Sequence, residues 1–433
     1  MKRVIIALLM IAVVAAGVVA QEKVTLNVLN YQQADQAGYQ EDVKIWQDFQ
    51  AQNPDITLNM EVLFNDPYHQ KLQAYAAAGT MPDVFYAWPT TRDSVVQDKH
   101  LAKDLSTVLG ADFLKNFTAA ATNPKSQYGS YMALLPQSFT YTSVMYVNKK
   151  LFTDNGLKVP TTYADLKAAV PRLKAKGIAV MMLPDKDGWP GQSCFFSTIA
   201  GRFAGDAFFD AIKAGKAKFT DKPFVDALTA VANFYKDGII QASDNSVGYG
   251  DGAGLFAQGK AAIYLDGDWR TGAYITDKAS GKALISPDDQ KHYALMNLVS
   301  LPGEKNQGIT SAIAGTGWAI SSTLPAGSAK EKAAVRLIKY LYSKQVQSIR
   351  YGTGAYVPTR MDATATVEPL PGMLPPFYAA NPKTCYVLDG VLDPTVATVI
   401  NNGVINLGNG TQTPDQVAAD VQKAFDTWKA TQK

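Results

Sequence analysis

The chain has 433 residues, of which 47% are hydrophobic and 18% are charged. This length and composition allow two or three domains with a sizeable apolar core, and they exclude a disordered or low-complexity chain. The 41 Lys and Arg residues are almost balanced by 38 Asp and Glu residues, so the chain lacks the basic surface that nucleic-acid binding requires and we expect no nucleic-acid partner.

The N-terminal segment, residues 1–20, has the pattern of a cleaved secretory signal peptide. Lys2 and Arg3 precede an uncharged apolar run that ends in small residues at Ala20. An uncleaved membrane anchor is the alternative, because the run is close to the shortest length that spans a bilayer. No cysteine follows the run, so we expect an exported, periplasmic protein that is not a lipoprotein.

Strand and helix patterns then alternate along the chain. Apolar residues alternate over 24–28 and 56–62, which predicts strands, and they recur at helical spacing over 39–49 and 68–79. A short apolar run at 84–88 predicts a third strand. The order strand, helix, strand, helix, strand indicates an α/β fold with a largely parallel sheet.

Three later helices are predicted together with their first residues. The capping pairs are Thr162 with Asp165, Ser328 with Glu331, and Thr413 with Gln416. The last of these helices carries an apolar stripe that ends at Trp428. We assign Trp428 to the core, because a continuous stripe at this spacing normally faces a sheet.

Motifs for catalysis and metal binding are missing. The three histidines, His69, His100 and His292, are far apart, and no metalloprotease, hydrolase or nucleotide-binding motif is present. The glycine-rich segment 250–254 lacks the spacing of a phosphate loop, and we predict a turn there before a helix. A glycosidase pair is recognised only by its separation in space. We therefore predict no catalytic residue, no metal and no cofactor.

Tryptophans stand where a ligand site is expected. Trp88 ends a predicted strand, and Trp189 and Trp269 lie in polar loops rich in Asp and Gly. Strand ends line the ligand crevice of an open α/β sheet. A flat ring there offers an apolar face to the C–H side of a sugar, while nearby polar side chains bind its hydroxyls.

Five sequence blocks in a fixed order then identify a family. They are AAAGTMPDV at 76–84, YVNKKLF at 146–152, FAQGKAA at 256–262 followed by GDW at 267–269, GWAIS at 317–321, and GAYVPTR at 354–360. With these blocks the chain resembles the family 1 extracellular solute-binding proteins, the maltose-binding-protein-like receptors of ABC sugar importers. The similarity extends from the signal peptide to the last helix.

The resemblance implies a periplasmic-binding-protein-like fold, in which two α/β lobes are joined by a hinge of several crossings and enclose a ligand cleft. We assign residues 21–137 with 300–350 to lobe 1 and residues 138–299 with 351–433 to lobe 2. The crossings are expected near 136–140, 298–301 and 351–358. Gly352 and Gly354 suit a hinge, with an ordinary loop as the alternative.

The resemblance also carries over some binding positions. Trp269 is similar to the stacking tryptophan of the maltose receptor, Trp88 lies within a residue or so of another family tryptophan, and Tyr141 stands where that receptor has an acidic sugar ligand. Asn401 and Ala397 stand where it has an arginine and a tryptophan, so maltose itself is put in doubt. The expected ligand-binding residues are Gln32 and Trp88 on lobe 1, Tyr141, Trp189, Asp268 and Trp269 on lobe 2, and Trp318.

We therefore expect a monomeric, non-enzymatic substrate-binding protein that captures a sugar or oligosaccharide and delivers it to the membrane permease subunits of an ABC importer. A secreted carbohydrate-active enzyme and a sugar-sensing receptor are the alternatives. The two cysteines, Cys194 and Cys385, are expected as buried free thiols rather than as a disulfide.

Overall fold

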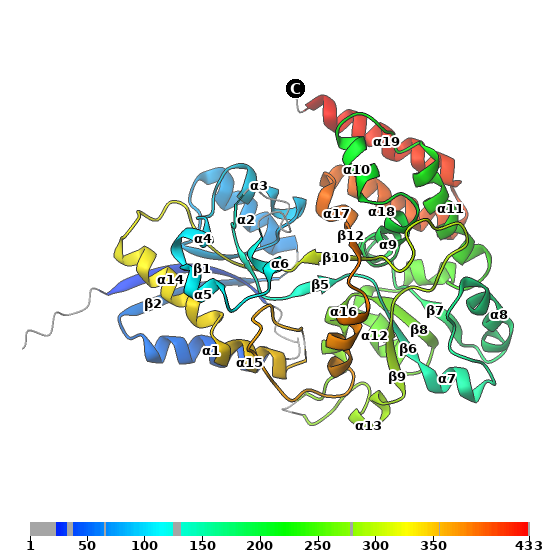
Figure 1. The fold of residues 1–433 in the computed structure, drawn as a ribbon, viewed down its shortest axis with the longest axis horizontal. Helices are drawn as coiled ribbons and strands as arrows, with labels where there is room; N and C mark the ends of the chain where they lie inside the picture. The colour runs from blue at the N-terminus through cyan, green and yellow to red at the C-terminus, as the bar shows by residue number, and fades with distance from the viewer. Residues whose placement is uncertain are drawn as a thin grey trace, which may run out of the picture.

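A computed structural model describes residues 23–32, 38–64, 66–123, 131–277, 280–354 and 356–431. The predicted signal peptide, residues 1–20, lies outside the described residues. Within the described ranges, no helix combines the length and the apolar character needed to cross a bilayer. Figure 1 shows two halves, each built on its own β-sheet, with a third small sheet between them.

Lobe 1 is built on a five-stranded sheet in the order β2-β1-β3-β11-β4. Its strands are β1 (Val24–Tyr31), β2 (Ile56–Leu63), β3 (Val84–Ala87), β4 (Leu135–Pro136) and β11 (Gly317–Ile320). β1 pairs in parallel with β2 and β3, whereas β11 is antiparallel to β3 and β4. The three N-terminal strands and their parallel arrangement are thus confirmed.

Helices cover both faces of this sheet. Val28 of β1 packs in one cluster with α1 (Tyr39–Gln52) and α14 (Ala329–Leu341), and its neighbour Leu29 packs in another with α2 (Asp66–Ala78). Successive strand residues point to opposite faces, so one strand serves two cores. The remaining helices of this lobe are η1 (Thr91–Asp93), α3 (Ser94–Asp98), α4 (Leu105–Val108), α5 (Ala111–Leu114), α6 (Ala119–Thr122) and α15 (Lys344–Gly352).

Lobe 2 contains a four-stranded sheet in the order β7-β8-β6-β9. Its strands are β6 (Val144–Asn148), β7 (Ala179–Met182), β8 (Ala261–Asp266) and β9 (Tyr293–Met296). Its helices before β9 are α7 (Lys149–Asp154), α8 (Tyr163–Lys174), η3 (Gly191–Phe196), α9 (Ser197–Phe203), α10 (Asp206–Lys213), α11 (Lys222–Lys236), η4 (Ala242–Ser246), α12 (Tyr249–Ala257), η5 (Asp268–Ala273) and α13 (Pro287–Gln290). Those near the C-terminus are η6 (Pro371–Met373), α16 (Leu374–Ala380), α17 (Leu388–Val391), α18 (Pro394–Asn409) and α19 (Pro414–Thr431).

The small middle sheet contains β5 (Phe139–Tyr141), β10 (Thr310–Ala314) and β12 (Thr384–Cys385). β4 leads directly into β5, and β10 leads directly into β11, so two connections run side by side between the lobes (Figure 1). The third lies between α15 and α16. The second connection comes later than we expected, because Leu301 still packs in the core of lobe 2.

Side-chain hydrogen bonds cap the three helices whose first residues were predicted. The Thr162 hydroxyl accepts from the Asp165 amide in a capping box, and Ser328 accepts from the Glu331 amide. The Gln416 amide donates to the Thr413 hydroxyl at 3.3 Å. All three predicted starts are confirmed. Cys194 and Cys385 are buried and unbridged.

The glycine-rich segment 250–254 was predicted wrongly, because it lies inside helix α12 rather than in a turn. Tertiary packing explains one of the three glycines. A Cβ atom on Gly252 would overlap Pro184 and the Tyr264 side chain, whereas Gly250 and Gly254 have no atom within 4 Å of that position.

Candidate ligand-binding site

Three aromatic side chains lie at the carboxyl ends of the three parallel strands of lobe 1. Tyr31 is the last residue of β1, Phe64 directly follows β2, and Trp88 directly follows β3. The Tyr31 ring is 5.0 Å from the Phe64 ring and 4.6 Å from the Trp88 ring. We call these residues the first aromatic cluster. They occupy the strand ends where open α/β sheets bind ligands.

A buried carboxylate holds Trp88 in place. Asp93 is 1% exposed, and its two oxygens accept from the Trp88 amide and from Nδ1 of His69, both at 3.0 Å. The His69 ring then packs against the Trp88 ring at 4.7 Å. Because a buried carboxylate needs partners, Asp93 fixes both the backbone and one side of the Trp88 ring.

A second aromatic cluster, in lobe 2, consists of Trp189, Tyr249 and Trp269. The Trp189 ring is 4.6 Å from the Tyr249 ring and 6.2 Å from the Trp269 ring, and both tryptophans are partly exposed. Nε1 of Trp269 donates to the Tyr249 hydroxyl at 2.5 Å. A Cβ atom on Gly267 would overlap the Trp269 ring, so the ring can lie over the backbone only because residue 267 is glycine.

Two buried charged residues contact Tyr249 of the second cluster. Asp266 is 1% exposed and pairs with Nε of Arg270 at 2.5 Å. The Arg270 guanidinium lies 4.2 Å from the centre of the Tyr249 ring. Burial, together with the Asp266 charge, raises the pKa of Tyr249 well above its usual value. Its hydroxyl therefore stays protonated and donates to Asp266 at 3.2 Å.

Tyr141 and Asp268 lie together, but their polar atoms form hydrogen bonds within the protein. Asp268 is 4% exposed and accepts from the Tyr141 amide at 2.8 Å and from the Tyr378 hydroxyl at 2.7 Å. The Tyr141 and Tyr378 rings stack at 4.6 Å. Burial raises the pKa of Asp268 to about 7. This group joins β5 to α16 and sits directly beside Trp269.

The two remaining predicted residues have different surroundings. Gln32 follows Tyr31, and its Oε1 accepts from Asn30 at 3.1 Å, while its buried Nε2 has no partner among the described residues. Trp318 is 2% exposed, and its ring lies 5.2 Å from the rings of both Trp46 and Tyr86. Trp318 therefore belongs to the core of lobe 1, and we leave it out of the proposed contact set.

Direct contacts link the loop after Trp88 to the segment after Trp189. The Thr91 hydroxyl donates to the carbonyl of Asp389 in α17 at 2.6 Å. The Asp389 carboxylate in turn accepts from Ser193, in η3, at 2.7 Å. The two lobes thus touch beside the aromatic clusters, and the tryptophan-bearing segments lie on the sides of the lobes that meet.

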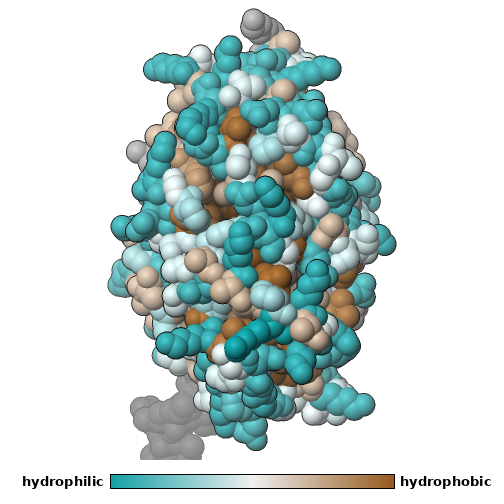
Figure 2. Space-filling view, turned by 90° about the vertical axis from the view of Figure 1, so that its right-hand side faces the viewer, coloured by the Kyte–Doolittle hydropathy of each residue, from teal (hydrophilic) through white to brown (hydrophobic). Residues whose placement is uncertain are grey.

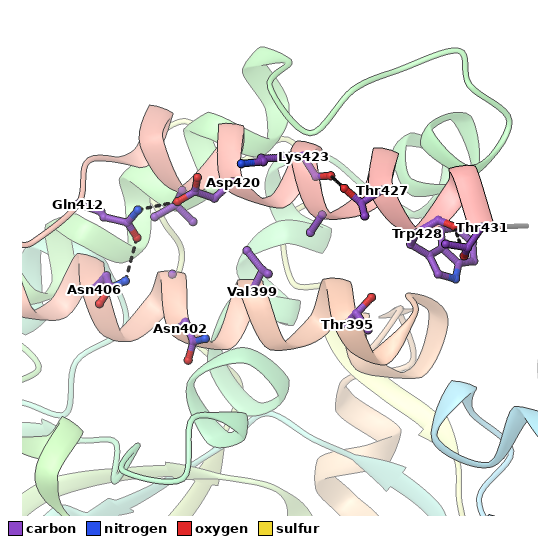
Figure 3. Close-up of a pocket in the computed structure, with 13 residues that line it drawn as sticks. Thr395, Val399, Asn402, Asn406, Gln412, Asp420, Lys423, Thr427, Trp428 and Thr431 are labelled. Carbon is purple, nitrogen blue, oxygen red and sulfur yellow. Dashed lines mark hydrogen bonds between the residues drawn. The ribbon is translucent and has the colours of Figure 1, made fainter.

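A separate groove of about 650 Å³ runs between α18 and α19, with Trp428 at one end (Figure 3). Trp428 is only partly buried and packs against Phe425 at 5.5 Å. The prediction that Trp428 belongs to the core is confirmed in part: the side chain packs against the core of lobe 2 but remains partly exposed. None of the predicted ligand residues lines this groove. The outer face of lobe 2 is mainly hydrophilic, with scattered apolar patches (Figure 2).

No cluster of three or more His, Cys, Asp and Glu side chains suited to a metal ion occurs in the described part of the chain. The arrangement instead offers flat apolar rings on both lobes, with amides, hydroxyls and carboxylates around them. Such a combination binds a polar molecule that also has an apolar face.

The two lobes, their connecting segments and an aromatic cluster on each lobe are the features of a two-lobed α/β binding protein. Residues 32–348 match the family model of the bacterial extracellular solute-binding proteins, and the chain belongs to this family.

Known relatives share the fold across most of the chain. The multiple sugar-binding protein of Streptococcus mutans is 24% identical over 360 residues, which cover 81% of this chain and 79% of that protein. A structure from work on xylan utilization by Caldanaerobius polysaccharolyticus has a TM-score of 0.78 at 23% identity, covering 92% of this chain and 99% of the other. A chitin oligosaccharide binding protein has a TM-score of 0.76 at 21% identity, covering 94% of this chain and all of the other.

Proposed function

We propose that the solute is a sugar or oligosaccharide bound between the first and second aromatic clusters. The observation that carries the proposal is the presence of partly exposed tryptophans on both lobes, Trp88 on one and Trp189 with Trp269 on the other. Aromatic faces pack against the C–H faces of pyranose rings, and the polar groups nearby bind hydroxyls. Gln32 is the polar candidate on lobe 1, because its buried Nε2 is without a partner among the described residues.

The names of relatives support a carbohydrate. One is called a multiple sugar-binding protein and another a chitin oligosaccharide binding protein. The chain differs from the maltose receptor at Ala397 and Asn401, so we propose a sugar other than maltose.

In the proposed cycle, the sugar favours the closed arrangement because it contacts both lobes at once. The Thr91–Asp389 contact adds a direct link between the lobes in that arrangement. The closed protein then delivers the sugar to the permease subunits of an ABC importer. It would do so as an exported, periplasmic monomer whose signal peptide ends at Ala20, with neither a cofactor nor catalytic activity of its own.

A ligand screen on the mature chain tests the proposal. The melting temperature is measured with maltotriose, xylotriose, a chitin trisaccharide and raffinose, with single amino acids and a tripeptide as controls. We expect one class of saccharide to raise the melting temperature and to give a saturable calorimetric signal without being cleaved. A shift with amino acids or peptides alone contradicts a sugar solute, and cleavage of the saccharide indicates the enzymatic alternative.

A further inference from the structure

The three segments that connect the lobes meet at one buried residue, Gln137. Its backbone amide donates to the backbone carbonyl of Thr316, in the second connection, at 2.9 Å. Its backbone carbonyl accepts from the backbone amide of Thr359, in the third connection, at 2.8 Å. Gln137 itself belongs to the first connection, between β4 and β5, and it is 8% exposed.

The side chain of Gln137 extends this meeting point into a polar network. Its Nε2 donates to the Tyr86 hydroxyl at 2.8 Å, and its Oε1 accepts from Nη1 of Arg350 and from the Tyr356 hydroxyl. Nε of Arg350 binds Asp42 of α1 at 2.8 Å. The Tyr86 hydroxyl also pairs with the Thr316 hydroxyl at 2.5 Å. We call Tyr86, Gln137, Thr316, Arg350 and Tyr356 the junction.

The backbones of the first two connections approach each other closely at this point. The Gly315 amide donates to the carbonyl of Ser138 at 2.9 Å. A Cβ atom on Gly315 would overlap that carbonyl, and one on Gly317 would overlap the carbonyl of Leu135. The two connections therefore behave as one ribbon, and the junction fastens that ribbon to the sheet of lobe 1.

Tyr86, a member of the junction, also touches the first aromatic cluster. It lies in β3, two residues before Trp88, and its ring is 5.4 Å from the Trp88 ring. The Tyr31 ring is nearly parallel to it at 6.1 Å. The ring of Tyr86 thus contacts the proposed sugar platform, while its hydroxyl bonds to two of the three connections.

We propose that Tyr86 is a positioning residue that couples the first aromatic cluster to the angle between the lobes through its hydroxyl. Its ring maintains the platform, and its hydroxyl holds the connecting ribbon in the orientation in which the lobes meet. Loss of the hydroxyl alone leaves every proposed sugar contact in place but loosens the ribbon. A smaller fraction of the protein is then in the arrangement that binds tightly, so the apparent affinity falls. The coupling to affinity rests on the proposed function, whereas the coupling to the lobe angle does not.

The test compares Tyr86→Phe with Tyr340→Phe. Tyr340 is a matched control, because its hydroxyl binds the carbonyl of Ile45 within lobe 1, away from the connections. Solution scattering and amide hydrogen exchange are measured without ligand. We expect Tyr86→Phe to change the scattering curve and to speed exchange at the amides of residues 137–139 and 314–317, and Tyr340→Phe to match the wild type. If Tyr86→Phe only lowers the melting temperature, with scattering and exchange unchanged, the coupling is overturned.

A second pair of variants acts on the other side of the same hydroxyl contact. Thr316→Val removes the hydroxyl that pairs with Tyr86, whereas Thr316→Ser keeps one. Thr316→Val should reproduce the scattering and exchange changes, and Thr316→Ser should restore wild-type behaviour. Equal behaviour of the two variants contradicts the proposal.

Calorimetry with whichever saccharide of the screen binds the wild type then tests the link to affinity. Tyr86→Phe should weaken binding about 5-fold or more, the lower end of typical coupling between sites. Unchanged affinity overturns that link. If no saccharide binds the wild type, the proposed function fails, and the ligand-free measurements still decide whether Tyr86 sets the lobe angle.

Discussion

The two lobes carry aromatic clusters of similar composition, but different interactions hold the two clusters in place. In lobe 1, Tyr31, Phe64 and Trp88 stand at the ends of parallel strands, and the buried Asp93 carboxylate accepts from the Trp88 amide. In lobe 2, Trp269 lies over Gly267 and donates to Tyr249, which in turn contacts the buried Asp266–Arg270 pair. The first cluster follows from sheet topology, whereas the second depends on local charge and on the absence of one Cβ atom. Substitutions should therefore affect them in different ways.

Some acidic residues of the two lobes also have pKa shifts of opposite direction. Burial raises the pKa of Asp185 to about 8 and the pKa values of Asp244 and Asp268 to about 7, and all three lie in lobe 2. In lobe 1, hydrogen bonds lower the pKa of Glu61 and Glu331, through Tyr75 and Lys103 respectively. Rising pH should therefore weaken lobe 2 more than lobe 1.

The largest effect is expected from breaking the ion pair in lobe 2. Arg270→Met leaves Asp266 buried without its cation, which should lower the free energy of unfolding by about 3–5 kcal/mol. Urea denaturation measures this. Lys150→Met is the control, because Lys150 and Asp154 form an exposed pair, and its effect should stay below about 1 kcal/mol. Equal losses for the two variants would show that the buried pair does not support the second cluster.

The next effect concerns the Trp269 platform itself. Trp269→Ala should weaken sugar binding by about 2 kcal/mol or more, as truncated aromatic anchors do, with little loss of stability. Gly267→Ala should also weaken it, because the new methyl group displaces the ring. Gly254→Ala is the matched control, since no atom lies within 4 Å of the position its Cβ would take. Calorimetry that finds wild-type affinity for Gly267→Ala contradicts the assigned position of the ring.

The pH dependence of the free energy of unfolding distinguishes the buried acids of lobe 2 from exposed acids. Burial raises the pKa of Asp185 to about 8, far above that of an aspartate in the unfolded chain, so the native state favours the protonated form. Its contribution to stability is complete below about pH 4 and is lost as the pH rises toward 8. At about 1.4 kcal/mol per pKa unit, Asp185→Asn should be more stable than the wild type at pH 8 by up to about 5 kcal/mol, and should differ little at pH 4. Asp251→Asn, at an exposed position, is the control. A pH-independent difference contradicts the assignment.

The smallest effect is expected outside both clusters, at Trp428. Because this side chain is only partly buried, Trp428→Ala should cost about 1–2 kcal/mol of stability, less than the 3–5 kcal/mol of a fully buried tryptophan. Sugar affinity should not change. Loss of affinity with a normal melting temperature would instead place the solute in the groove between α18 and α19.

Much of the fold could be predicted because it depends on local patterns. Alternation and helical spacing found β1, β2, β3 and their helices, and the capping pairs found three helix starts. Periodicity could not show that Gly252 packs against Tyr264, so a helix was mistaken for a turn.

The candidate site was harder to predict from the sequence than the fold, because its contacts join segments that are far apart along the chain. Trp88 was found as a strand end, but Tyr31 and Phe64 were missed, although the same rule applies to them. Their proximity depends on the pairing of β1 with β2 and β3. Asp268 was expected to face the ligand, yet its partner Tyr378 lies 110 residues away along the chain.

Solution scattering with and without sugar tests whether a ligand held by both clusters closes the lobes. The saccharide with the largest thermal shift is added at saturation to the wild type and to Trp88→Ala. We expect a smaller radius of gyration for the wild type, and a weaker affinity for Trp88→Ala even though Trp269 is intact. A wild-type scattering curve that is unchanged by a tightly bound sugar would contradict closure by contact with both lobes.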